Sequence, residues 1–434
     1  MSATKELVVV GGRPLSGRLR LPGDKSISHR ALLFAALASG ASRVRRLADG
    51  DDVRSTREAI ERLGVRVHEL PEGGLVINGR GVDGLHEPHT VIDCGNSGTS
   101  MRLLLGLLAG RPFHSVLTGD DSLCRRPMAR VAEPLRRMGA HVDGREGGKH
   151  APLAVRGGGL QGIRHELPVA SAQVKSALVL AGLQADGVTD VLEPAPSRDH
   201  TERMLTAFGA PVEAVDGGVQ VRRGAPSPFE LDVPGDPSSA AFFAVAACIT
   251  PGSDVVLEEV CLNPSRVRYL DVLARMGADV EARVTGDRAG EPVGDIHVRA
   301  SRLSGTVVEG DEVPAVQDEI PVLAVAAAFA EGLTEFRDAA ELRVKESDRI
   351  ATMEQELTEL GVATESRADA LVVRGGHPRT GLWRSHGDHR VALAGAIAGV
   401  ALPGETKVRG WQAVSISYPG FVDDLAALGG AVGQ

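Results

Sequence analysis

An internal repeat constrains the fold of this chain more than any other feature of its sequence. Two apolar residues three positions apart, followed by glycine and then by Val or Thr within three residues, occur six times in the 434 residues. The intervals are 68–84 residues, and such a regular period indicates repeated supersecondary units. The repeat glycines are Gly64, Gly139, Gly209, Gly277, Gly361 and Gly429. The chain therefore divides into six units of about 72 residues, a period too long for a solenoid.

Each unit is expected to contain two helices and several short strands. The repeat predicts the end of an amphipathic helix with a C-cap glycine, followed by the start of a strand. Short β-branched runs such as 74–81 and 370–376 predict further strands, so the fold class is mixed α/β. A second segment, rich in Ala and Leu and poor in aromatics, recurs at 21–40, 94–110, 169–187, 233–252, 316–332 and 386–404. These segments predict six interior helices covered by sheet, because small apolar side chains suit close packing on all sides.

The units also fall into two halves. Residues 21–40 match residues 233–252 almost position for position. This match predicts a crossing between two sets of three units near residue 234. The opening strand, 6–10, would then belong with the C-terminal half.

Charge and cysteine usage exclude several classes of protein. The 57 acidic and 48 basic residues give a net charge of −9 at pH 7, which argues against nucleic acid or an anionic membrane as the main partner. No apolar run approaches the roughly 20 residues of a membrane span, and the first residues do not resemble a signal peptide. The four cysteines are scattered, so we expect reduced thiols in a cytoplasmic protein.

The interior helices of the N-terminal half begin with cations and small polar residues. Helix N-termini attract anions because their first N–H groups are unpaired and carry partial positive charge. Lys25, Ser26 and Arg30 lie at the first such start, and the small-residue turn 94–102 could approach phosphate or carboxylate closely. Each feature alone also fits an ordinary helix with solvated charges, capped by Ser26 or Ser28. Further candidates for anion binding are Gly98, Arg126, Ser171, Gln173 and Arg198.

The C-terminal half places acids beside cations at the corresponding positions. Its candidate residues are Asp318, Lys345, Glu346, Arg349 and Arg390. Acids next to cations are typical of groups that transfer protons, although an acid at a helix start can also simply complement the helix dipole. Residues 386–390 contain two histidines and an aspartate but no third ligand cluster, so we expect no metal site.

Together, these clusters predict a site for two small polyanions, with a general acid and a general base from the C-terminal half. The sequence lacks a Walker P-loop, a Rossmann glycine motif after its first strand, a GxSxG elbow and a metal-ligand cluster. We therefore expect group transfer that needs no cofactor.

In these same segments the chain resembles the 5-enolpyruvylshikimate-3-phosphate (EPSP) synthase family, the 3-phosphoshikimate 1-carboxyvinyltransferases, and within it class II. The resemblance covers essentially the full length and rests, in the family's order, on LPGDKSISHRALL, GNSGTSMRLL, RRPM, ASAQVKSA, DEIP, LRVKESDR and GDHR. It implies two similar domains, residues 24–234 and residues 1–23 plus 235–434, with crossovers near 22–24 and 233–236. Each domain would contain three βαβαββ units with sheets around buried helices, the inside-out barrel of enolpyruvyl transferases.

The resemblance also implies a reaction of the shikimate pathway, on the way to chorismate and the aromatic amino acids. A monomer would transfer the enolpyruvyl group of phosphoenolpyruvate to the 5-hydroxyl of shikimate-3-phosphate and release phosphate. Asp318 would take the hydroxyl proton, Glu346 would protonate the methylene carbon, and Lys25 would be a third catalytic residue. The implied contacts to shikimate-3-phosphate are Lys25, Ser26, Arg30, Ser171, Gln173, Arg198, Asp318 and Lys345. Those to phosphoenolpyruvate are Lys25, Gly98, Arg126, Gln173, Arg349 and Arg390.

Two positions depart from the family pattern. Ile416 stands where many members have a lysine just before an aromatic–Pro pair, so no C-terminal cation is assigned. Ala172 replaces the second serine of the usual Ser-Ser-Gln. The class II pattern tolerates both departures, so the implied activity is unchanged.

Two alternatives remain open. UDP-N-acetylglucosamine 1-carboxyvinyltransferase shares the fold and the donor, but it usually has Lys-Asn in its first motif and a loop cysteine several residues before Arg-Pro. Here Ser26 follows Lys25, and Cys124 stands only two residues before Arg126. The other alternative is a non-catalytic anion-binding paralogue, against which the intact acids and lysine of the C-terminal half argue.

Overall fold

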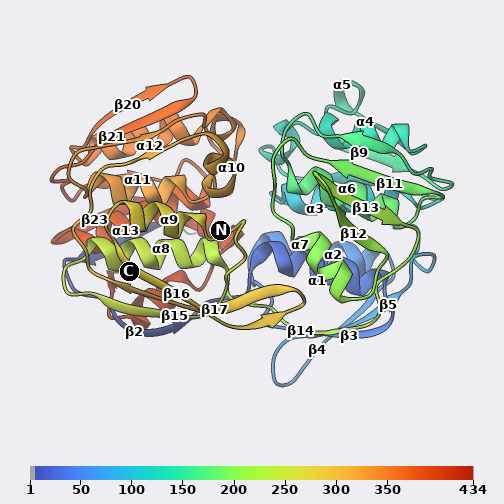
Figure 1. The fold of residues 1–434 in the computed structure, drawn as a ribbon, viewed down its shortest axis with the longest axis horizontal. Helices are drawn as coiled ribbons and strands as arrows, with labels where there is room; N and C mark the ends of the chain where they lie inside the picture. Colours follow the sequence, from blue (N-terminus) through green and yellow to red (C-terminus); the bar gives the residue numbers. More distant parts are fainter. Residues whose placement is uncertain (1–4, 434) are drawn as a thin grey trace. The chain divides into compact units, whose positions relative to one another are not determined.

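The computed structural model describes residues 5–433 of the chain (Figure 1). By their internal contacts these residues form two compact units. The central unit comprises Gly23–Val233 and Asp287–Glu291. The terminal unit comprises the described residues up to Pro22, Pro234–Gly286 and the described residues from Pro292 onward.

Within residues 5–433 the strands form six four-stranded sheets, three in each unit. In the central unit the strand orders are β14 (Glu230–Asp232)–β3 (Ser39–Arg45)–β5 (Leu75–Arg80)–β4 (Arg66–Glu69), β6 (Ile92–Asp93)–β7 (His114–Thr118)–β9 (His150–Arg156)–β8 (His141–Gly144), and β10 (Arg164–Glu166)–β11 (Val188–Leu192)–β13 (Gly218–Arg222)–β12 (Val212–Val215). In the terminal unit they are β16 (Asp279–Arg288)–β17 (Glu291–Arg299)–β15 (Asp254–Cys261)–β2 (Ser16–Arg20), β18 (Val307–Val308)–β19 (Leu333–Phe336)–β21 (Ala370–Arg374)–β20 (Ala363–Arg367), and β22 (Leu382–Arg384)–β23 (Gly404–Arg409)–β1 (Glu6–Gly11)–β24 (Ala431–Gly433).

The six sheets share one plan. In each, an outer strand pairs in parallel with an inner strand, which in turn pairs antiparallel with the other inner strand. Strand β1 pairs antiparallel with β23, with Glu6 opposite Arg409, and so joins the last sheet of the chain. The repetition of one plan confirms the predicted mixed α/β fold of six units.

Each of the two compact units, central and terminal, buries three helices, and these six are the interior helices expected from the sequence. They are α1 (Lys25–Leu37), α3 (Gly98–Ala109) and α6 (Ala172–Gly182) in the central unit, and α8 (Pro237–Ile249), α11 (Ile320–Ala328) and α13 (His389–Ala401) in the terminal unit (Figure 1). Every residue of α8, α11 and α13 is buried. No helix within residues 5–433 combines the length and the apolar character needed to cross a membrane.

Six other helices are amphipathic or largely polar and end at the repeat glycines. They are α2 (Asp51–Arg62), α4 (Ala129–Arg137), α7 (His200–Ala207), α9 (Arg268–Arg275), α12 (Arg349–Glu359) and α14 (Phe421–Ala427). The six repeat glycines all have φ between 75° and 108°, a left-handed conformation that favours glycine and confirms the predicted caps. Short helices complete the fold: α5 (Arg145–Gly148), α10 (Val313–Val316), η1 (Leu123–Arg125), η2 (Gly310–Glu312), η3 (Ala340–Val344) and η4 (Trp411–Ile416).

Gly106 marks the close approach of two buried helices in the central unit. Helix α3 packs against α6, and a Cβ atom at Gly106 would lie 2.1 Å from the carbonyl oxygen of Ala177. We expect Gly106→Ala to lower the free energy of unfolding by about 1–3 kcal/mol because the helices must separate. In an unconstrained helix the same change is favourable by about 1 kcal/mol. Chemical denaturation measures the difference.

The control for this substitution is Gly376→Ala. A Cβ atom at Gly376 would meet nothing within 4 Å, and its backbone is not left-handed. Its unfolding free energy should therefore stay close to that of the wild type. Equal stability of the two variants would contradict the proposed close packing at Gly106.

Candidate active site

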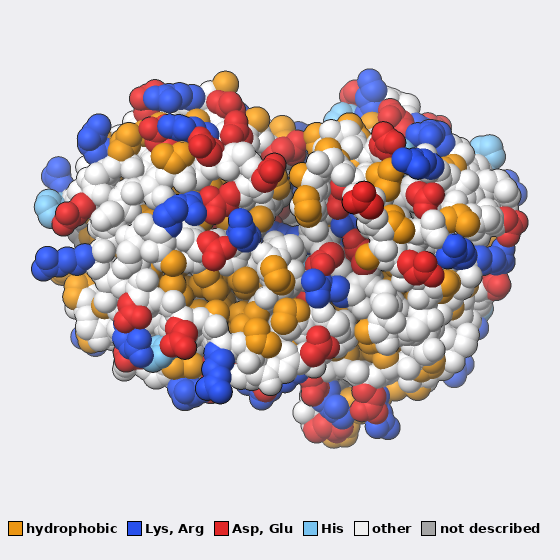
Figure 2. Space-filling model, in the orientation of Figure 1, with side chains coloured by type: hydrophobic (Ala, Val, Ile, Leu, Met, Phe, Trp, Pro, Cys, Tyr) orange, Lys and Arg blue, Asp and Glu red, His pale blue; other side chains and the backbone are white. Residues whose placement is uncertain are grey.

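Charges on the surface of the chain differ in kind from those inside it. Basic and acidic side chains intermix over the face seen in Figure 2. Many form exposed pairs, such as Arg299 Nη1 with Asp279 Oδ2 at 3.2 Å. Such pairs contribute little, whereas a buried charge must be paired or hydrogen-bonded. The charged candidate residues are either buried, as Arg30, Arg349 and Arg390 are, or partly buried.

The start of α1 carries a negatively charged cap. The carboxylate of Asp24 accepts the N–H of Ile27 at 2.7 Å, and the Ser28 hydroxyl donates to the Asp24 carbonyl oxygen at 2.7 Å. The expected serine cap is therefore wrong. Ser26 stays partly exposed at the helix start, so its hydroxyl is not consumed by capping.

Lys25 and Arg30 are both held by groups of the central unit. Lys25 Nζ lies 2.8 Å from Oδ2 of Asp52. The Arg30 guanidinium is buried and donates to Thr201 Oγ1 and to Ser176 Oγ, both at 2.7 Å. Burial lowers the pKa of Arg30 to about 10, so it remains a cation at neutral pH.

The start of α3 holds two guanidinium groups. Ser97 caps the helix by accepting the N–H of Ser100 at 3.1 Å. A Cβ atom at Gly98 would lie 2.7 Å from Nη1 of Arg102 and 3.3 Å from Nη1 of Arg126. Gly98 thus leaves room for two cations beside a helix N-terminus, an arrangement suited to an anion. Arg102 was not among the residues predicted from the sequence, although its position one helical turn after Gly98 could have indicated it.

The start of α6 is joined to the start of α3 by Gln173. Its Oε1 accepts a hydrogen bond from Arg102 Nη1 at 2.5 Å, and its Nε2 donates to Thr99 Oγ1 at 2.9 Å. Ser171 is the N-cap residue of α6, and within the described chain its side chain makes no capping hydrogen bond. Arg198 is partly buried in the segment that leads into α7. The structure therefore groups Gln173 with the α3 cations.

Buried hydroxyl groups join α1 to α3 through α2. Nδ1 of His29 lies 2.7 Å from Oγ1 of Thr56, which lies 2.6 Å from Oγ of Ser100. Burial, with Lys25 and Arg30 nearby, holds the pKa of His29 well below its usual range, so the imidazole is neutral. Helices α1 and α3, which carry several of the candidate residues, are therefore connected through α2.

In the terminal unit, Asp318 lies just before α11 and contacts two arginines. Its Oδ1 is 3.3 Å from Nη1 of Arg349, and its Oδ2 is 3.6 Å from Nη2 of Arg390. Arg390 Nη1 also donates to the Asp318 carbonyl oxygen at 2.8 Å. The Asp318 side chain remains 19% exposed, so its carboxylate is fixed in place yet accessible.

Arg349 connects three carboxylates from three segments. Its side chain is 1% exposed, with Nη2 at 2.5 Å from Glu346 Oε2 and Nε at 2.8 Å from Asp388 Oδ2, in addition to Asp318. Burial opposes its charged form, but the three carboxylates outweigh burial and raise the pKa of Arg349 above its ordinary value. Asp388 also caps α13 by accepting the N–H of Arg390 at 2.9 Å. The predicted acids and arginines of this half are thus brought together.

Lys345 adds a cation next to this group. Within residues 5–433 its Nζ makes no ion pair or hydrogen bond, although Asp318 acts on its charge. Burial lowers the pKa of Lys345, Asp318 opposes the shift, and Arg349 adds to it. A partly buried ammonium of this kind is suited to an anionic ligand.

A second buried group of polar side chains, not predicted from the sequence, supports the start of α11. Glu319 Oε1 accepts from Ser238 Oγ at 2.6 Å, and Arg266 Nη2 donates to Ser238 Oγ at 3.0 Å and to Asp236 Oδ1 at 3.1 Å. Arg390 Nη1 lies 3.6 Å from Glu319 Oε1. The acid that follows Asp318 therefore ties α11 to α8 and α13.

Comparison with a family sequence model decides the family. The model of EPSP synthase (3-phosphoshikimate 1-carboxyvinyltransferase) matches residues 9–425. The chain belongs to the EPSP synthase family. The predicted family is therefore confirmed over nearly the whole sequence.

Relatives within the EPSP synthase family are similar over their full lengths. The 3-phosphoshikimate 1-carboxyvinyltransferase of Desulforudis audaxviator is 52% identical over 428 residues, which cover 97% of this chain and 99% of the relative. That of Thermus thermophilus is 53% identical over 418 residues, covering 96% and 97%.

Solved structures confirm the predicted enolpyruvyl transferase fold. An EPSP synthase from Acinetobacter baumannii matches with a TM-score of 0.88 and 42% identity, covering 99% of this chain and 100% of that one. The enolpyruvyl transferase NikO from Streptomyces tendae matches with a TM-score of 0.79 over 99% of both chains. At 19% identity, the likeness to NikO shows a shared fold alone.

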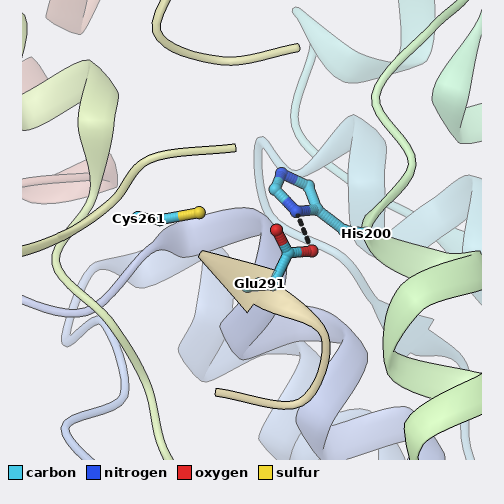
Figure 3. A group of neighbouring side chains, drawn as sticks. All are labelled: His200, Cys261 and Glu291. Atoms are coloured by element: carbon cyan, nitrogen blue, oxygen red, sulfur yellow. Dashed lines mark hydrogen bonds and ion pairs between the residues drawn. The ribbon is translucent and has the colours of Figure 1, made fainter. Parts of the chain in front are cut away.

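In this EPSP synthase family member, one further buried pair lies near Arg30 and its hydrogen-bond partner Thr201. His200 Nδ1, at the start of α7, is 2.8 Å from Glu291 Oε1, and both side chains are almost fully buried (Figure 3). The third residue drawn in Figure 3, Cys261, belongs to the terminal unit. Because Thr201 follows His200 and accepts the Arg30 hydrogen bond, the pair helps to fix the first turn of α7.

Proposed function

We propose that the chain transfers the enolpyruvyl group of phosphoenolpyruvate to the 5-hydroxyl of shikimate-3-phosphate and releases phosphate. The observation that carries the proposal is the pairing of two accessible acids, Asp318 and Glu346, with one buried arginine, Arg349. Full-length membership of the EPSP synthase family supports the same reaction. We propose that the reaction needs no cofactor.

The cations described above support binding of two phosphorylated, carboxylated substrates. We assign Lys25, Ser26, Arg30, Ser171, Gln173, Arg198, Asp318 and Lys345 to shikimate-3-phosphate. We assign Lys25, Gly98, Arg126, Gln173, Arg349 and Arg390 to phosphoenolpyruvate. Fixed cations of this kind balance the charge of both substrates and need no reorganisation during the reaction.

In the proposed mechanism, addition is followed by elimination. Asp318 takes the proton of the 5-hydroxyl as its oxygen forms a bond to C2 of phosphoenolpyruvate, and Glu346 protonates the methylene carbon. The positive charge that develops at C2 is neutralised as the attacking oxygen forms its bond to that carbon. The C2–O bond to phosphate then breaks, the leaving phosphate takes the proton held by Asp318, and one methyl proton returns to Glu346, so the vinyl group is restored and atoms and charge balance. Lys25 would stabilise the phosphate-bearing oxygen of the donor during both steps.

We also propose how this activity is organised in the chain. The central and terminal units would correspond to functional domains 24–234 and 1–23 plus 235–434, acting as a monomer in the cytoplasm. Burial of three cysteines, Cys94, Cys248 and Cys261, supports reduced thiols that pack as small apolar side chains. Light scattering of the purified chain measures the oligomeric state.

The reaction is tested by phosphate release from the purified chain. Turnover is expected only when shikimate-3-phosphate and phosphoenolpyruvate are both present, and the product should carry the enolpyruvyl ether. Turnover with UDP-N-acetylglucosamine in place of shikimate-3-phosphate would refute the assignment of the acceptor. If no acceptor supports turnover although both ligands bind, the chain would instead be a non-catalytic paralogue.

A further inference from the structure

Lys175 is a buried cation with two carboxylate partners in the central unit. Its side chain is 4% exposed, and its Nζ lies 2.8 Å from Oε2 of Glu193 and 2.7 Å from Oε1 of Glu202. Burial opposes the charged form, but Glu202 and Glu193 outweigh burial and raise the pKa of Lys175 above its ordinary value. The ammonium group is therefore charged at neutral pH.

The two carboxylates stand at the two ends of the segment that carries Arg198. Glu193 directly follows β11, and Glu202 lies in the first turn of α7. Glu193 also accepts hydrogen bonds from the N–H of Ser197, at 3.2 Å, and from the Ser197 hydroxyl. Residues 193–199 are irregular in conformation, so side-chain contacts rather than a helix or sheet ladder order them. One ammonium group thus fixes both ends of this segment.

The same segment reaches Arg30. Ser176, next to Lys175 on α6, has its Oγ 2.6 Å from Oγ1 of Thr201, and Thr201 Oγ1 accepts the hydrogen bond from Arg30 Nε at 2.7 Å. Displacement of the first turn of α7 would therefore disturb Arg30 as well as Arg198. Both arginines belong to the acceptor group of the proposed function.

We propose that Lys175 is a positioning residue for the phosphorylated acceptor: it holds residues 193–202 so that Arg198 and Arg30 can bind shikimate-3-phosphate. The inference rests on the proposed function. Stabilisation of the fold alone explains such a triad poorly, because well-packed apolar residues usually stabilise as much as a buried ion pair. The ammonium group pairs with Glu193 and Glu202 at once, and so it attaches one point of α6 to both ends of an irregular segment.

The test compares the KM for shikimate-3-phosphate with the KM for phosphoenolpyruvate in the Lys175→Met variant. We expect the KM for shikimate-3-phosphate to rise about 10-fold or more, with the KM for phosphoenolpyruvate at saturating acceptor and kcat each changed less than about 3-fold. Such a split indicates lost acceptor binding rather than a general loss of folded enzyme. An unchanged KM for shikimate-3-phosphate in folded Lys175→Met would overturn the proposal.

Arg111→Met is the matched control. Arg111 is also a buried cation of the central unit, but it bonds to Gln184 Oε1 at 2.9 Å beyond the C-terminal end of α6. We expect this variant to lose stability with little change in either KM. An equal rise of the acceptor KM in Arg111→Met would show that destabilisation alone produces the effect and would overturn the proposal.

Two further measurements keep the test decisive. If Lys175→Met does not fold, Ser197→Ala removes only the hydroxyl bond to Glu193, and we expect the acceptor KM to rise about 3-fold; no rise would overturn the proposal. Amide hydrogen exchange measures how well the segment is ordered and does not require an active enzyme. Residues 193–202 should exchange faster in Lys175→Met than in Arg111→Met. If the wild type is inactive, the proposed function fails, and the exchange measurement alone then decides: faster exchange confined to 193–202 supports the positioning role, and unchanged exchange overturns it.

Discussion

Replacement of Asp318 with alanine is expected to lower kcat by about 10²–10⁴-fold, while binding of shikimate-3-phosphate stays measurable. In the proposed mechanism this carboxylate takes the proton of the attacking hydroxyl. Arg349 and Arg390 fix its position, at 3.3 Å and 3.6 Å, and leave it partly exposed. Steady-state kinetics measures the loss of kcat, and titration calorimetry measures acceptor binding.

The control for Asp318→Ala is Glu354→Gln. Glu354 is a partly buried acid of α12 in the same unit, where its carboxylate accepts the N–H of Ser366 at 2.7 Å. Its loss should affect packing locally and leave kcat near the wild-type value. Near-normal turnover of Asp318→Ala would remove Asp318 from its assigned role. If kcat falls in both variants, the effect would come from damage to the fold of the terminal unit rather than from loss of the Asp318 carboxylate.

Local sequence signals were sufficient to predict the repeating architecture. Helices α2, α4, α7, α9, α12 and α14 end where the chain needs a left-handed backbone conformation. A glycine such as Gly64, with φ of 87°, therefore appears in each of the six repeats. The interior helices must pack on all sides, and their Ala- and Leu-rich composition reports this directly. Both signals depend on neighbours within a few residues of each other, which a single sequence displays.

Such local signals could not predict which charged side chains pair with one another inside the candidate site. Charge and helix position selected Arg349, but nothing local indicated that one guanidinium would meet carboxylates 31 and 39 positions away, Asp318 and Asp388. Lys175 was similarly visible as a cation in a motif but not as the partner of Glu193 and Glu202. These pairings are set by the packing of helices onto one another, so periodicity does not reveal them.

The serine cap failed for a related physical reason. Asp24 and Ser26 are both good cap residues, and the sequence offers both within two positions. The fold buries Asp24 fully and leaves Ser26 partly exposed. A buried carboxylate must find donors, and the free N–H groups of the helix start supply them. The cap was therefore decided by burial, which only the structure shows.

Replacement of Arg349 with methionine is expected to lower the free energy of unfolding by about 3–5 kcal/mol, because it leaves buried carboxylates without their cation. The Asp388 side chain is 0% exposed, and those of Asp318 and Glu346 are 19% and 17% exposed, so water screens the group only in part. Turnover should fall as well, since Asp318 and Glu346 lose the group that fixes both. Urea denaturation followed by circular dichroism measures the stability change.

The pH dependence of that loss separates electrostatics from lost packing. Without Arg349, the three carboxylates repel one another in the folded variant, and protons bound at lower pH reduce that repulsion, so the stability of the variant recovers as the pH falls. The deficit of Arg349→Met relative to the wild type should therefore shrink between about pH 8 and about pH 5. Arg343→Met is the control: this arginine is 28% exposed and pairs with Asp348 at 2.7 Å, so its loss should cost about 1 kcal/mol or less. A deficit in Arg349→Met that does not change with pH would assign the effect to a cavity, and the carboxylates would then not depend on Arg349 for their arrangement.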